Sequence, residues 1–209
     1  MGAPRLLLIT DPDARRGIVA PIEEALTQRG GHAVTVQLRA KSASARSLYE
    51  AALALRQLTR AVGARLVVNT RADIARAVGA DGVHLPEGGL PVAATRSILP
   101  GALVGVSCHD AAGLERAAEE GADYAVLGPI AAVPGKNPPL GLAGFERLVA
   151  SARLPVLALG GVRVEDVSAL CRAGAHGVAV IRAVTHASDP AAATDAFIRA
   201  LDRSAGDAR

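Results

Sequence analysis

The chain has 209 residues, of which 50% are hydrophobic, 21% are charged and only 2% are aromatic, and its formal net charge is +3. This length predicts one domain with a substantial core, and this apolar content excludes an intrinsically disordered chain. With no Trp, two Tyr and two Phe, the composition also excludes the aromatic platforms on which single-strand nucleic-acid binders stack bases.

The basic residues are 21 Arg and two Lys, Lys41 and Lys136, and they are scattered singly along the chain. Scattered arginines are typical of solvated helix surfaces, so we expect no nucleic-acid partner. The small positive surplus suits a small anionic substrate better than a polyanion.

Cys108 and Cys171 lie 63 residues apart, which matches neither a zinc-ligand spacing nor a disulfide framework. The start MGAPRLLLIT reaches Asp11 too soon for a signal peptide, and no apolar run approaches the ~18 residues of a membrane span. We therefore expect a cytoplasmic protein that has no membrane partner.

Short apolar runs alternate with longer Ala-rich segments that have helical spacing. The predicted strands span 6–10, 33–38, 66–69, 82–85, 103–107, 124–128, 155–159 and 177–181. The predicted helices span 18–29, 44–62, 71–78, 91–98, 110–120, 142–152, 163–173 and 190–203. Because the strand segments are hydrophobic without alternation, they are predicted to be buried on both faces, as in a parallel sheet.

Eight strand–helix units in one chain predict a single-domain (β/α)8 TIM barrel over residues 1–203, followed by a frayed polar tail at 204–209. The alternative is an open doubly wound sheet. It has less support, because no GxGxxG follows the first strand and no GxxxxGK[ST] motif occurs.

In such a barrel the active site forms at the C-terminal ends of the strands, where the polar residues of this chain gather. The candidates at these positions are Gln37, Arg39, Lys41, Asn69, Ser107, His109, Gly128 and Lys136. The Pro-rich loop 134–139, which carries Lys136, is a candidate for a positioned loop or lid.

A phosphate site is predicted from Gly160 and Gly161 after the seventh strand and from Ile181 and Arg182 after the eighth. Small residues let backbone N–H groups approach an oxyanion, and helix N-termini favour negative charge. Arg182 either adds a charged contact or points to solvent.

Arg39 and Lys41 stand two positions apart beyond a buried strand, so their side chains can lean the same way over the barrel mouth. A planar fork next to a compact charge suits a carboxylate or a phosphate. Two ordinary surface cations are the plainer interpretation. The scarcity of Lys weakens it, because both lysines of the chain fall in predicted strand-end loops.

His109 follows the fifth strand and is the best candidate for an acid or base, because an imidazole titrates close to neutral pH. His84 lies within the fourth strand and is interpreted as a satisfied core or mouth histidine. No Ser–His–Asp arrangement and no metal-ligand spacing stands out in the sequence.

Eight stretches in order along the chain carry a family resemblance. They are LLLITD at 6–11, VQLRAK at 36–41, VNTRADIARAVGADGVHLP at 68–86, VGVSCHD at 104–110, GADYAVLGPI at 121–130, GKNPPLGLAGF at 135–145, LALGGV at 157–162 and GVAVIRA at 177–183. Together they resemble the thiamine phosphate synthase/TenI superfamily of barrels, from the first strand to the last.

The resemblance implies one of two activities. A thiamine phosphate synthase joins hydroxymethylpyrimidine diphosphate to a thiazole phosphate with the help of Mg²⁺. A thiazole tautomerase moves a proton on a thiazole phosphate carboxylate with a histidine and no metal. The chain keeps the superfamily's anion-binding positions, which are Gln37, Arg39, Lys41, Ser107, Lys136, the Gly160–Gly161 pair and the strand-8 loop.

The chain departs from the synthase pattern at the metal positions. The Asn-Asp expected after strand 3 is Asn69-Thr70, and the second expected carboxylate, after strand 4, is replaced by Gly89. Val133 stands where a threonine is expected. Because carboxylates hold Mg²⁺ in proteins, metal-assisted diphosphate departure is predicted to be impaired, unless Glu87 compensates for both losses.

The loop Leu85-Pro86-Glu87-Gly88 resembles the tautomerase version, and His109 occupies the position of the tautomerase histidine, which some synthases also carry. We therefore expect first a metal-independent tautomerase of a small phosphorylated thiazole, without cofactor and possibly a homodimer. The alternatives are a synthase that uses Mg²⁺ and a non-catalytic thiazole- or thiamine-phosphate binding protein.

Overall fold

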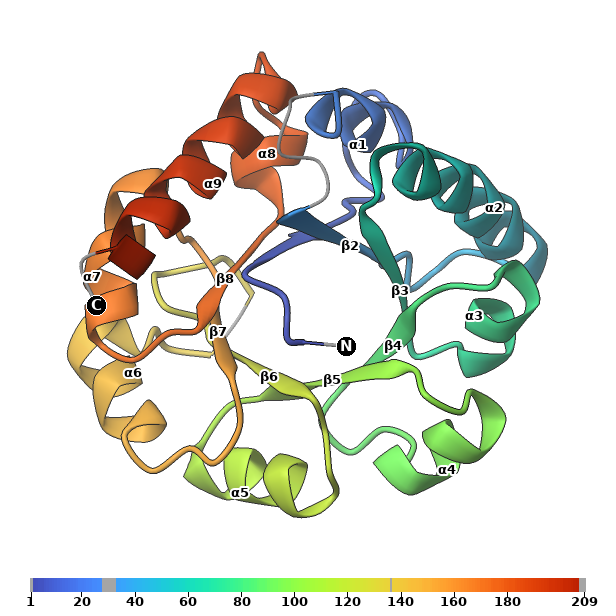
Figure 1. Cartoon of the computed structure of the whole chain (residues 1–209). Helices are drawn as coiled ribbons and strands as arrows, with labels where there is room; N and C mark the ends of the chain where they lie inside the picture. The colour runs from blue at the N-terminus through green and yellow to red at the C-terminus, as the bar shows by residue number, and fades with distance from the viewer. Residues whose placement is uncertain (1, 28–32, 136, 207–209) are drawn as a thin grey trace.

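Eight parallel strands close into a barrel in the order β1 to β8, and the helices surround it (Figure 1). The computed structural model describes residues 2–27, 33–135 and 137–206. The predicted (β/α)8 barrel is confirmed, and the open doubly wound sheet is wrong because β8 pairs with β1 and closes the sheet.

The strands are β1 Leu6–Ile9, β2 Val34–Leu38, β3 Arg65–Asn69, β4 Gly82–Leu85, β5 Leu103–Cys108, β6 Tyr124–Leu127, β7 Val156–Leu159 and β8 Gly177–Val180. Each predicted strand is present, and no end differs from its predicted position by more than one residue. The continuous apolar runs located them well because all eight strands are covered on both faces.

The helices are α1 Ala20–Ala25, α2 Ala45–Val62, α3 Ala72–Val78, α4 Val92–Ile98, α5 Ala111–Glu119, α6 Gly141–Val149, η2 Val164–Asp166, α7 Val167–Arg172, α8 Arg182–Thr185 and α9 Pro190–Gly206. Local signals set several ends. The Ser44 hydroxyl accepts a hydrogen bond from the Ser47 N–H at the start of α2, and Gly63 ends that helix with a left-handed φ of 72°.

Three helical predictions need correction. Helix α1 covers less than the predicted 18–29, since Pro21 lies in its first turn and Leu26 is its C-cap; residues 28 and 29 lie outside the described residues. The predicted helix 163–173 is divided into η2 and α7, and the four-residue helix α8 was not predicted. Helix α9 continues to Gly206, beyond the expected start of fraying at Ser204, whose hydroxyl donates to the Ala200 carbonyl.

Alternate side chains of the strands build two cores. Leu8, Val36 and their equivalents pack between the strands and the helices. Leu7, Val67 and Tyr124 belong to a second cluster that fills the interior of the barrel. Because successive residues of a strand point to opposite faces, the inward-pointing residues at the C-terminal ends of the strands must form the floor of any site there.

Two matching ion pairs brace the other end of the barrel. Asp81, just before β4, accepts a hydrogen bond from the Leu66 N–H and pairs with the two terminal guanidinium nitrogens of Arg56, Nη1 at 2.7 Å and Nη2 at 3.3 Å. Asp123, just before β6, accepts from the Val104 N–H and pairs with Arg96 at 3.1 Å. Each carboxylate thus ties a helix to the start of a strand.

Of the helices in the described ranges, none is both long and apolar enough for a membrane span.

Candidate active site

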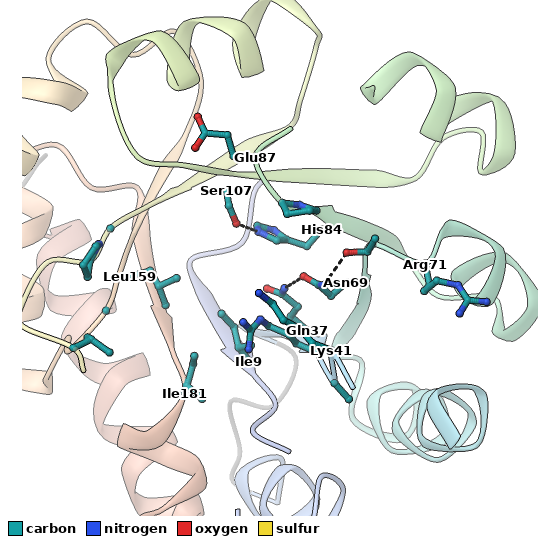
Figure 2. A pocket seen from close by; sticks show the side chains of 18 of the residues that line it. Ile9, Gln37, Lys41, Asn69, Arg71, His84, Glu87, Ser107, Leu159 and Ile181 are labelled. Atoms are coloured by element: carbon teal, nitrogen blue, oxygen red, sulfur yellow. Dashed lines mark hydrogen bonds between the residues drawn. The ribbon is translucent and has the colours of Figure 1, made fainter. Parts of the chain in front are cut away.

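A cavity of about 820 Å³ opens at the C-terminal ends of the strands (Figure 2). Nine of the predicted site residues line it: Gln37, Arg39, Lys41, Asn69, Ser107, His109, Gly128, Gly160 and Ile181. Gly161 and Arg182 are not among the lining residues, and Lys136 lies outside the described residues. The sequence therefore located the cavity, while two of its four phosphate-binding candidates stay outside the wall.

Hydrogen-bonded amide side chains connect β2 to β3 across the floor of the cavity (Figure 2). The Gln37 Nε2 donates to Asn69 Oδ1 at 3.0 Å, and Asn69 Nδ2 donates to the Thr70 hydroxyl at 2.9 Å. Gln37 is only 1% exposed, and its Oε1 has no hydrogen-bond partner among the described residues. Buried acceptors normally have a donor, so this oxygen is suited to an N–H or O–H of a ligand.

His84, on β4, forms a second buried network beneath the cavity. Its Nε2 lies 2.9 Å from the Ser107 hydroxyl and its Nδ1 lies 3.3 Å from the Tyr124 hydroxyl. Burial, with a smaller contribution from the positive charge of Arg39, lowers the pKa of His84 to about 3. A Cβ at Gly105 would lie 2.1 Å from the Tyr124 ring, so the ring occupies the space that this glycine leaves open.

Arg39 and Lys41 bring positive charge to the cavity wall, and neither forms an ion pair with a described residue. The buried Thr10 fixes the backbone from which they extend: its hydroxyl accepts from the Arg39 N–H at 2.8 Å and donates to the Arg39 carbonyl at 3.1 Å. Arg71 also lines the cavity, but it is paired with Asp73. The uncompensated charge of Arg39 and Lys41 is suited to an anionic ligand.

His109, which follows β5, lines the cavity with its side chain half exposed. Its Nδ1 is 3.1 Å from the Gly128 carbonyl oxygen, which can only accept, so Nδ1 carries a hydrogen and the lone pair of the neutral ring is on Nε2. That Nε2 lies 3.8 Å from Glu87 Oε2, and the other oxygen of Glu87 accepts from Arg116 at 3.0 Å. His109 is therefore oriented to exchange a proton through Nε2.

The glycine pair after β7 is required by its backbone and its neighbours. Gly160 and Gly161 have φ values of 100° and 69°. A Cβ on Gly160 would lie 2.7 Å from Pro129 Cα, and one on Gly161 would lie 2.8 Å from Ala131 Cβ. The loop after β7 thus packs closely on the loop after β6, and phosphate binding by this pair stays a prediction.

The described residues do not fit the Mg²⁺ site that the synthase resemblance implies. Thr70 stands where one carboxylate is expected, and its hydroxyl already accepts from Asn69. Glu87, the nearest substitute, is paired with Arg116. Among the described residues, no three His, Cys, Asp or Glu side chains gather in a group that could hold a metal. Hard cations need such oxygen ligands, so no catalytic step is assigned to a protein-held metal.

Sequence reasoning did not include His84 among the site candidates and missed part of the apolar wall. Its interpretation as a core or mouth histidine is accurate for burial, since it is 3% exposed, yet it also lines the cavity. Ile9 and Leu159, which were not predicted as site residues, form apolar wall beside it together with the predicted Ile181. These residues lie at strand ends, and alternate residues of each strand point into the barrel. This pattern identifies lining residues only when the register between strands is known, for example that Asn69 lies opposite His84.

Comparisons with known proteins give consistent matches along most of the chain. A family model described as thiamine monophosphate synthase matches residues 6–184. The chain is 42% identical over 194 residues to a thiamine-phosphate synthase of Chloroflexus aurantiacus, covering 90% of this chain and 88% of the relative. It is 43% identical over 192 residues to one of Methanoculleus marisnigri, covering 90% of each. A solved thiamine phosphate pyrophosphorylase of Pyrococcus furiosus has a TM-score of 0.86 at 34% identity and 96% coverage of both chains.

Proposed function

The chain belongs to the thiamine monophosphate synthase family, whose relatives are enzymes of thiamine biosynthesis, and we propose that it joins hydroxymethylpyrimidine diphosphate to a thiazole phosphate. The observation that carries the proposal is similarity over almost the entire barrel to relatives named for this reaction. This reverses the order expected from the loops, which placed a tautomerase first and the synthase second.

The size and charge of the cavity support a reaction with two substrates. Its volume of about 820 Å³ lies in the upper part of the range of roughly 300–1,000 Å³ that ligand pockets span. Its wall includes the uncompensated Arg39 and Lys41 from the β2 loop and the glycine turn at Gly160 from the β7 loop. Two strand-end loops can therefore bind the phosphate groups of two ligands.

In the proposed reaction, the thiazole nitrogen forms a bond to the methylene carbon of the pyrimidine. The carbon–oxygen bond to the diphosphate breaks, and its electron pair leaves with the diphosphate. Arg39 and Lys41 would neutralise the negative charge that develops on this leaving group. Gln37 Oε1 would accept a hydrogen bond from a heterocycle, and the Gly160 turn would hold the thiazole phosphate.

A tautomerase is the second candidate, and a specific observation favours it. The carboxylates that would hold Mg²⁺ are replaced by Thr70 and Gly89, while His109 presents a basic Nε2 at the cavity wall. In that reaction His109 takes a proton from the thiazole and returns it at another position. General acid–base catalysis of this kind contributes about 10²- to 10⁴-fold.

The test is a paired assay in which the purified chain receives each substrate set, with and without Mg²⁺. We expect diphosphate release that requires both the pyrimidine and the thiazole substrate. Isomerisation of the thiazole carboxylate without diphosphate release would contradict the synthase and favour the tautomerase. In that case His109→Asn should abolish turnover. Ligand-induced thermal stabilisation with neither turnover would instead indicate a binding protein.

A further inference from the structure

Three side chains from three neighbouring strands form one continuous hydrogen-bonded array below the cavity. Tyr124 on β6 is fully buried, His84 on β4 is 3% exposed, and Ser107 on β5 lines the cavity. Figure 2 shows the contact between His84 and Ser107. The Tyr124 hydroxyl lies 3.3 Å from His84 Nδ1, and the Ser107 hydroxyl lies 2.9 Å from His84 Nε2. The proposed function assigns no step to Tyr124 or His84.

The array admits two hydrogen-bond directions, since His84 is neutral and has one N–H. In the first, Tyr124 donates to Nδ1, Nε2–H donates to the Ser107 oxygen, and the Ser107 hydrogen is left for the cavity. In the second, Nδ1–H donates to the Tyr124 oxygen and Ser107 donates its hydrogen down to Nε2.

Burial of Tyr124 decides between these directions. Its hydroxyl has no hydrogen-bond partner other than His84 among the described residues. In the second direction the phenolic hydrogen would therefore be an unsatisfied buried donor, which is costly. In the first direction every buried donor has an acceptor. Burial also raises the pKa of the Tyr124 hydroxyl, so it keeps its hydrogen at neutral pH.

We propose that Tyr124 and His84 are positioning residues that direct the Ser107 hydroxyl hydrogen toward the cavity, where it favours an anionic ligand oxygen. The first half of this proposal concerns the unliganded protein. The second half rests on the proposed function, because it takes the ligand to be a phosphate or diphosphate ester. One lone pair of the Ser107 oxygen then accepts from the buried Nε2–H and its hydrogen faces the cavity, which favours an oxyanion at this point.

The first test is ¹⁵N NMR of the imidazole nitrogens in the unliganded chain, with His84→Gln used to assign the His84 signals. We expect a neutral ring with its hydrogen on Nε2 at neutral pH. A hydrogen on Nδ1 would overturn the proposal. This measurement needs no substrate and no variant of Tyr124, so its outcome is independent of whether the chain is a synthase.

The second test is a double-mutant cycle in which the probe is inorganic diphosphate, measured by calorimetric titration. Ser107→Ala should weaken binding about tenfold or more, since a hydrogen bond to a charged group is lost. Tyr124→Phe should weaken diphosphate binding about threefold to tenfold, because His84 Nδ1 loses its donor and the Ser107 hydrogen is then no longer directed toward the cavity. Adding Tyr124→Phe to Ser107→Ala should weaken it no further.

Tyr49→Phe is the matched control, because Tyr49 is the other tyrosine of the chain and is 39% exposed on α2. It should leave diphosphate binding unchanged. Losses that add in the double variant would overturn the proposal, since they would mean that Tyr124 acts on binding without Ser107. Unchanged binding in Ser107→Ala would overturn it as well.

Discussion

At the N-terminal end of the barrel, Arg56 and Arg96 are each paired with an aspartate that also accepts a strand N–H. At the C-terminal end, Arg39 and Lys41 line a cavity and form no ion pair within the described part of the chain. Arg56 and Arg96 are thus neutralised within the described fold, whereas Arg39 and Lys41 are not. The contrast indicates that positive charge at the cavity serves a ligand and not the stability of the barrel.

The largest expected effect is on stability, at the Asp81–Arg56 pair near the N-terminal end of the barrel. Asp81→Ala should lower the free energy of unfolding by about 3 kcal/mol, because it leaves the largely buried Arg56 without its charge partner and removes the acceptor of the Leu66 N–H. Urea unfolding measures this. Asp195→Ala, which breaks an exposed i,i+4 pair, is the control and should change stability by less than about 0.5 kcal/mol. Equal losses in the two variants would contradict the structural role of the Asp81 pair.

The second effect is a pH dependence of the free energy of unfolding that comes from His84, which is buried beneath the cavity. His84 has a pKa of about 3 in the folded chain, whereas an unfolded histidine titrates near 6.5. Between these values the unfolded chain binds the additional proton. The contribution of His84 to stability is therefore complete above about pH 6.5 and is lost as the pH falls toward about 3, at about 1.4 kcal/mol per pH unit.

The measurement is the slope of unfolding free energy against pH, in the wild type and in His84→Gln. The other titrating groups are common to both chains, so the slope of the wild type should be steeper by about 1.4 kcal/mol per unit between about pH 6 and 4. Parallel curves would mean that the buried imidazole accepts a proton in the folded chain without penalty.

A third effect tests the packing that supports the cavity floor. Gly105→Ala places a methyl group against the fully buried Tyr124 ring and should destabilise the chain by about 2 kcal/mol. Gly144→Ala in helix α6 meets only an ordinary contact at 3.5 Å and should stabilise it slightly, since glycine is a poor helix former. The comparison uses thermal unfolding. It would go against this packing if both substitutions had the same sign.

The smallest effect is confined to binding, at the cavity end. Lys41→Met should weaken the affinity for inorganic diphosphate about tenfold, about 1.4 kcal/mol, and leave the free energy of unfolding unchanged. Arg46→Met, on the exposed face of α2, is the control for loss of one positive charge and should change neither quantity beyond a small long-range effect. A stability loss in Lys41→Met would place this lysine among the structural charges.

The fold was predictable because its strands are continuous apolar runs, which a barrel buries on both faces. The four-residue α8 is too short to have a periodic signal, and the division of 163–173 into η2 and α7 depends on local turn geometry. Arg39, Lys41 and His109 were found from their strand-end positions. His84 required the strand register, and Gly161, whose left-handed backbone packs close to Ala131, is not among the residues that line the cavity.

The choice of reaction was the least predictable feature. The loops at Thr70 and Gly89 lack the carboxylates of the synthase pattern and pointed to a tautomerase. The relatives named thiamine-phosphate synthase match about 90% of the chain, and the proposed reaction follows them.

The most direct test is a calorimetric titration of the chain with inorganic diphosphate in the presence of EDTA. If Arg39 and Lys41 take up the ligand charge, the wild type binds under these conditions, and the double variant Arg39→Met, Lys41→Met loses that binding while it unfolds at the same urea concentration. Binding that requires added Mg²⁺, or that survives in the double variant, would contradict the assignment of this cavity charge to the ligand.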